Sequence, residues 1–76
     1  MKARHIEVAA VEGLGFTLLV DGPKGRRAWW LFQRAEAANE EARILHEIHE
    51  KLFDLTGGVG PAPTLKLWEV SDAQAT

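Results

Sequence analysis

The sequence predicts an α+β fold, a two-layer sandwich in which one long helix packs on one face of a four-stranded, mostly antiparallel sheet. Residues 36–55 carry apolar side chains at helical spacing, and every other apolar segment is short and bounded by glycines. Short segments of that kind form strands that need the helix as a cover. We expect one small domain over residues 1–76, in the order β-β-β-α-β, with residues 71–76 as a frayed tail.

Three segments that precede the helix have strand character. Residues 4–11 alternate apolar and more polar side chains, and residues 16–20 follow them after a Gly-Leu-Gly turn. Glycines and a proline at residues 21–25 make a second turn, because glycine permits positive φ and proline cannot continue strand pairing. Residues 26–33 contain the most apolar run of the chain, Trp-Trp-Leu-Phe. These segments predict two consecutive hairpins.

The helix is expected to begin at residue 35 or 36 and to end near Gly57. No Ser, Thr, Asp or Asn stands at the natural N-cap position, while Gly57 can take the left-handed conformation that closes a helix. The apolar stripe that should face the sheet is Ala38, Ala42, Leu45, Ile48, Leu52 and Leu55. The opposite face should be wet and mostly acidic.

A fourth strand is expected over residues 64–70, after a loop stiffened by Pro61 and Pro63. If the helix runs back along the sheet, this strand is parallel to the first and third strands. It then occupies an edge beside whichever of them is free, and the sequence leaves both edges open.

The two faces of the sheet differ in how the helix can cover them. Adjacent strand residues point to opposite faces, so Trp29 and Trp30 cannot both lie under one helix. Taking the more apolar set of each strand puts Trp30 and Phe32 under the helix and leaves a surplus of apolar side chains on the open face. Because large exposed apolar patches usually mark interfaces, we predict a partner-binding surface there. Its residues are Leu19, Arg27, Trp29, Leu31, Lys66 and Trp68.

Two alternatives to that surface concern the strands themselves. The sheet can curl enough to bury the patch against the loop and the tail, or the fourth strand can be flipped.

Charge is distributed unevenly along the chain, whose net charge is −2. Six bases oppose three acids in residues 1–34, and six acids oppose two bases in residues 36–55. Attraction between basic strands and a solvated acidic helix face explains this pattern. The alternative is that the acidic face imitates a row of phosphates for a nucleic-acid-binding target. Its residues are Glu36, Glu40, Glu47, Glu50 and Asp54.

Nucleic-acid binding is the alternative function. The basic second hairpin combines cations with an aromatic ring, as single-strand binders do. The residues concerned are Lys24, Arg26, Arg27 and Trp29. The isoelectric point of about 5.9 and the lack of an RNP-type motif weigh against this function.

Signatures of catalysis, cofactor binding and metal binding are weak. The chain has no cysteine, its glycine clusters lack the Lys and Ser or Thr of a phosphate-binding loop, and no base is predictably near Ser71. His46, His49 and Glu50 share one part of the helix, but they supply only two or three metal ligands. We therefore expect no enzyme, no catalytic residues, no cofactor and no metal.

The sequence shows neither a targeting signal nor a membrane-spanning run, so we expect a cytoplasmic protein without membrane contact. In size, in its lack of catalytic groups and in its one-helix architecture, the chain resembles the small stand-alone accessory or inhibitor proteins of phages and mobile elements, including anti-CRISPR proteins. No motif carries this resemblance, which implies a regulatory protein that binds another protein. The surplus apolar sheet face predicts the same function, with a protein partner or a second copy, as a homodimer, on that face.

Overall fold

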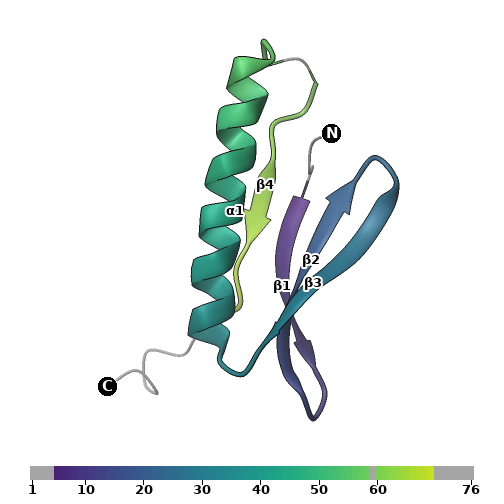
Figure 1. The fold of residues 1–76 in the computed structure, drawn as a ribbon, viewed down its shortest axis with the longest axis vertical. Coiled ribbons are helices and arrows are strands. Elements are labelled where there is room, and N and C mark those ends of the chain that lie inside the picture. Colours follow the sequence, from purple (N-terminus) through teal and green to yellow (C-terminus); the bar gives the residue numbers. More distant parts are fainter. Residues whose placement is uncertain (1–4, 59, 70–76) are drawn as a thin grey trace.

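The computed structural model describes residues 5–58 and 60–69 and has the predicted α+β fold (Figure 1). Its elements are β1 (His5–Val11), β2 (Gly15–Gly22), β3 (Gly25–Phe32), α1 (Ala35–Leu55) and β4 (Thr64–Lys66). The sheet order is β3-β2-β1-β4, with β4 parallel to β1 and the other pairs antiparallel. The prediction of a mostly antiparallel four-stranded sheet with one long helix is confirmed.

β4 takes the edge beside β1, where Ile6 is paired with Leu65. It is shorter than predicted, because only residues 64–66 pair; residues 67–69 belong to no strand, and Val70 lies outside the described residues. Figure 1 shows α1 running alongside β4 and β1, while the β2–β3 hairpin extends away from the helix. The helix therefore covers the part of the sheet formed by β4 and β1 more fully than it covers the β2–β3 hairpin. Within the described residues, no helix combines the length and apolar character needed to cross a membrane.

The two ends of α1 follow the local sequence. Arg34 precedes the first turn without a side-chain cap, as the lack of a capping residue predicted. At the other end Gly57 has a φ of 92° and donates its N–H to the Asp54 carbonyl at 3.1 Å, and Gly58 donates to the Phe53 carbonyl at 2.9 Å. These two bonds satisfy carbonyls of the last turn in the way that glycine-terminated helices commonly do.

The core is small and lies between α1 and the two central strands. Its buried hydrophobic side chains are Ile6, Val8, Leu18, Val20, Ala38 and Ala42. The helix contributes two alanines, so its backbone can approach the sheet closely, and larger side chains such as Leu45 and Phe32 pack around the margin.

α1 is rotated about its axis relative to the predicted stripe. Asn39 is buried although it is polar, whereas three residues expected in the stripe are exposed. These are Ile48, Leu52 and Leu55. The reason is a pair of hydrogen bonds: the Asn39 amide donates to the Trp68 carbonyl at 3.0 Å, and the Trp68 N–H donates to the Asn39 side-chain oxygen at 2.8 Å. Burying that amide satisfies two backbone groups and turns the row of larger apolar residues outwards.

A bulge in β3 overturns the predicted faces of the tryptophans. Phe16 pairs with Phe32 and Leu18 pairs with Trp29, so Thr17 alone stands opposite the two residues Trp30 and Leu31. Trp30 has a φ of 62°, and the Thr17 hydroxyl donates to its carbonyl at 2.6 Å.

The extra residue shifts the alternation of β3. Directly paired residues share a face, so Trp29 and Phe32 both lie on the helix side, with Leu18 and Phe16. The placement of Trp29 on the open face is therefore wrong, and so is the placement of Trp30 under the helix, since 70% of Trp30 is exposed.

Candidate functional site

A row of exposed apolar side chains runs along the side of α1 that is turned away from β4. His46 shares a hydrogen bond of 3.1 Å with the Pro63 carbonyl, and Asn39 is bonded to Trp68, so these residues face the β4 side. On a helix of 3.6 residues per turn, residues 44, 48, 52 and 55 fall on the other side of the buried stripe. We call Ile44, Ile48, Leu52 and Leu55 the α1 row; their exposed fractions range from 40% to 81%.

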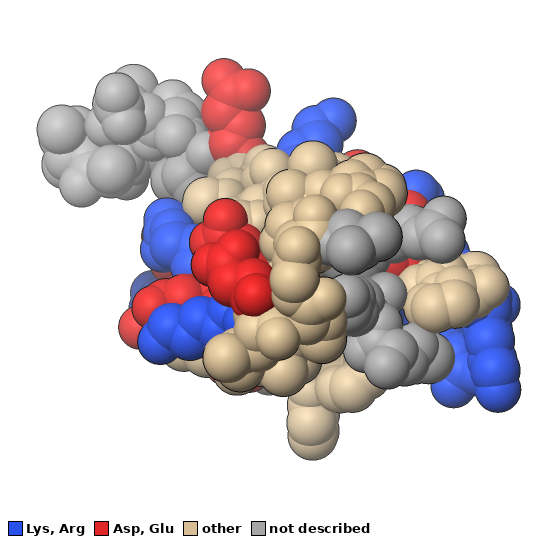
Figure 2. All heavy atoms as spheres, turned by 90° about the horizontal axis from the view of Figure 1, so that it is seen from above, with Lys and Arg blue, Asp and Glu red and all other residues tan. Residues whose placement is uncertain are grey.

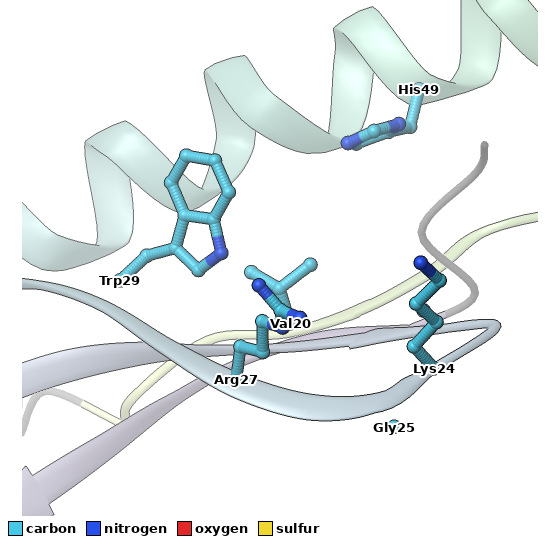
Figure 3. A pocket seen from close by; sticks show the side chains of 7 residues that line it. Val20, Lys24, Gly25, Arg27, Trp29 and His49 are labelled. Atoms are coloured by element: carbon cyan, nitrogen blue, oxygen red, sulfur yellow. The ribbon is translucent and has the colours of Figure 1, made fainter.

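A cleft of about 390 Å³ opens between the underside of α1 and the β2–β3 hairpin. The residues that line this hairpin cleft are Val20, Gly22, Lys24, Gly25, Arg27, Trp29 and His49. Figure 3 shows the Trp29 indole rising from β3 towards α1 and the His49 imidazole descending from the helix, with Arg27 and Val20 between them and Lys24 on the far side. The α1 row lies next in rotation on the helix to His49, and we use the name α1–hairpin groove for the hairpin cleft taken together with this row.

Two cations of the hairpin cleft, Lys24 and Arg27, are not neutralised by any residue that the structure describes. Among the described residues, no carboxylate lies within ion-pair distance of Lys24 or Arg27. Arg26 differs, because its guanidinium bonds the Asp21 carboxylate at 2.7 Å and lowers the pKa of that carboxyl below its ordinary value. The cleft thus keeps a local positive charge in a chain of net charge −2.

The two histidines of α1 lie in different surroundings. His46 is bonded to Pro63 and lies 3.8 Å from the Glu50 carboxylate, whereas His49 lines the hairpin cleft. The Nδ1 atom of His49 is buried without a hydrogen-bond partner among the described residues. Within the described part of the chain, no three potential metal-ligating side chains lie together.

His49 makes the stability of the fold depend on pH. Burial, reinforced by nearby His46, lowers the pKa of His49 from its ordinary value of 6.5. As the pH falls, the unfolded chain takes up the proton first, so the free energy of unfolding should decrease below about pH 6.5. Urea unfolding between about pH 7.5 and pH 5.5 measures this loss, which should be smaller in a His49→Gln variant. An equal loss in both chains would contradict the assignment to His49.

The structure does not bring the six predicted partner-binding residues together. Trp29 and Arg27 lie on the helix side in the hairpin cleft, because Leu18 and Val20 are their strand partners. Trp68 contacts the ring of Phe16 edge-on, with ring centroids 5.3 Å apart.

The remaining three predicted residues are spread over the sheet. Leu31 is exposed at the bulge, and Leu19 and Lys66 are both register partners of Glu7, on the face away from the helix. His5 contacts Glu7 at 3.2 Å on the same strand. Around Glu7 the open face is therefore more polar than expected. Exposed apolar side chains occur in two places, Trp30 and Leu31 at the bulge of β3 and the α1 row on the helix.

The structure brings together most of the predicted nucleic-acid-binding residues and leaves the predicted acidic helix face exposed. Three of the four predicted nucleic-acid-binding residues, Lys24, Arg27 and Trp29, meet in the hairpin cleft, while Arg26 is occupied by Asp21. The members of the acidic helix face are all exposed: Glu36, Glu40, Glu47, Glu50 and Asp54. Seen from above in Figure 2, basic side chains gather at one edge of the molecule, acidic and basic side chains mix on the opposite side, and uncharged surface lies between them.

Sequence reasoning missed the part that α1 plays in this site. The predicted stripe includes Ile48 and Leu52, but with Ile44 they recur every four residues and form a separate row beside the buried Ala38 and Ala42. This row is the signal that the helix has more apolar surface than one sheet face needs. His49 and Val20 complete the cleft without any local motif. Comparison with protein-family models, with curated proteins and with solved structures found no match.

Proposed function

We propose that this chain is a non-enzymatic protein-binding module that takes a segment of a partner protein into the α1–hairpin groove. The observation that carries the proposal is the exposure of the α1 row on the helix side of the sheet, the side on which Trp29 lines the hairpin cleft. Grooves lined by apolar and aromatic side chains commonly hold an amphipathic segment of a partner, and tryptophan is enriched among the residues that dominate binding energy.

A protein that binds a partner through this surface can regulate that partner by blocking the part of it that is bound. A module that binds in this way acts by covering part of its partner, as an accessory or inhibitor protein does. The likeness in scale to small proteins of phages and mobile elements agrees with such a role and assigns no residue.

Site-specific photocrosslinking tests the groove. A photoreactive benzoylphenylalanine at Ile48 should give one crosslinked partner, through one segment of that partner, whereas the same group at Glu40 on the acidic face should give none. Unlabelled wild-type chain should compete the crosslink away. Loss of a central aromatic anchor commonly costs about 2 kcal/mol or more, which corresponds to a roughly thirtyfold higher Kd. A Trp29→Ser chain should therefore compete at least about tenfold less well.

Each other pattern of crosslinks would contradict the proposal. A partner captured from Glu40 and not from Ile48 would make the acidic helix face the binding surface. A crosslink between two copies of this chain, with light scattering that shows a dimer, would make the occupant a second copy.

Nucleic-acid binding is the second candidate, because Lys24, Arg27 and Trp29 converge in one cleft. Binding of an oligothymidylate that weakens steeply between low and moderate salt would favour it, since such a slope reports counterion release from phosphates. Binding of an apolar protein segment should depend far less on salt.

A further inference from the structure

The side chains that line the hairpin cleft offer hydrogen-bond donors and almost no acceptors. Lys24 and Arg27 carry only donors, and the indole of Trp29 carries one N–H and no acceptor. Among the described lining residues none has a carboxylate, hydroxyl or amide side chain, and His49 alone of them has ring nitrogens that can change role. A ligand that satisfies this set must bring acceptors.

Two features make the donors effective in place. Val20 is apolar and Gly22 and Gly25 have no side chains, so none of the lining residues that the structure describes neutralises Lys24 or Arg27. Hydrogen bonds from charged donors to an anion are about twice as strong as neutral ones, so Lys24 and Arg27 favour an anionic ligand over a neutral one.

The α1 row limits what can be attached to the anion. Ile48 and Leu52 stand exposed on the side of α1 that faces away from β4, next in rotation to the side that presents His49 to the cleft. A ligand that enters the cleft and continues along the groove must therefore combine one negatively charged group with bulky apolar groups.

We infer that the hairpin cleft is a carboxylate-recognition site, and that the partner segment in the α1–hairpin groove carries an Asp or Glu side chain beside large apolar residues. Lys24 and Arg27 bind the carboxylate, the Trp29 N–H adds a donor, and the apolar residues pack on Ile48 and Leu52. The inference rests on the proposed function, whose partner it describes chemically.

A nucleic-acid strand fits the same cleft less well. A strand presents a phosphate at every nucleotide, but among the described residues only Lys24 and Arg27 are cations that line the cleft. The helix beyond them is apolar along the α1 row, and beyond that row Lys51 pairs with Glu47 at 4.0 Å. Phosphates that continued past the cleft would meet apolar side chains, whereas an acidic and apolar peptide needs only one anion site.

Selection from a random peptide display library tests this inference without a known partner. The wild-type chain should enrich peptides in which an acidic residue lies within one helical turn of two or more large apolar residues. A Lys24→Gln/Arg27→Gln chain should lose the acidic preference and keep the apolar one. Lys66→Gln removes a positive charge on the opposite sheet face and should select the same peptides as the wild type.

The binding affinity of an enriched peptide then tests the carboxylate site quantitatively. Replacing its acidic residue by Gln or Asn should weaken binding to the wild type about tenfold or more, and should change binding to the Lys24→Gln/Arg27→Gln chain little. Lys24 and Arg27 are both exposed, so circular dichroism should show the Lys24→Gln/Arg27→Gln chain folded like the wild type. An Ile48→Asp chain should lose the wild-type and the neutral peptide alike.

The outcomes separate the inference from the proposed function. Enrichment of apolar peptides without acids, sensitive to Ile48→Asp, would overturn the carboxylate site and leave the protein-binding groove standing. Failure to enrich any peptide, or enrichment that Ile48→Asp does not affect, would overturn both. Oligothymidylate binding that Lys24→Gln/Arg27→Gln abolishes would assign the cations to phosphates instead.

Discussion

Leu18→Ala should unfold the protein or bring it close to unfolding. Leu18 is fully buried, and among the described residues only Ile6 matches it as a large, fully buried side chain. Its strand partners are Val8 on one side and Trp29 on the other, so it joins the centre of the sheet to the wall of the hairpin cleft. Truncating a leucine in such a position costs about 2–5 kcal/mol.

That cost is large for a chain of 76 residues. Globular domains have roughly 0.05–0.15 kcal/mol of stability per residue, which gives about 4–11 kcal/mol here. In urea, with a slope of about 1 kcal/mol per molar for a small protein, the midpoint should fall by about 2 M or more.

Leu19→Ala is the matched control for Leu18→Ala. Leu19 is the next residue of β2, is only partly buried, and pairs with Ala28 on the face away from the helix. We expect a loss of about 1 kcal/mol or less for this change. Equal midpoints for the two variants would mean that the faces of β2 are assigned the wrong way round.

Gly15→Ala should cost about 3 kcal/mol or more and disturb the end of β3. Gly15 begins β2 with a φ of 129°, a conformation that L side chains rarely adopt. A Cβ at Gly15 would overlap the carbonyl oxygen of Phe32, which is backbone and cannot rotate away. Backbone strain alone costs of order 1–3 kcal/mol, and the overlap adds the cost of moving β3.

Gly13→Ala separates strain from overlap. Gly13 also has a positive φ, 77°, but a Cβ there would meet nothing within 4 Å. It should cost only about 1–2 kcal/mol, the ordinary penalty of a left-handed residue. Unfolding in urea measures both variants, and near-ultraviolet circular dichroism should show altered tryptophan signals for Gly15→Ala alone. If Gly13→Ala were as destabilising as Gly15→Ala, the close approach of Gly15 to Phe32 would be disproved.

The sequence by itself determined the elements of this fold and their order. Glycine pairs and apolar runs mark the strands, the acidic and apolar period of residues 36–55 marks the helix, and Gly57 marks its end. Each of these signals is local, since turn chemistry, strand alternation and helix capping depend on residues within one or two turns of each other.

The tertiary structure alone decided which surface is exposed. Asn39 sets the rotation of α1 by bonding the backbone of Trp68, which is 29 residues away, and Thr17 stabilises a bulge by bonding the carbonyl of Trp30, 13 residues away. A single extra residue in β3 moves Trp29 from one face of the sheet to the other, because side chains alternate along a strand. These choices depend on hydrogen bonds between distant segments, and no local pattern in the sequence records them.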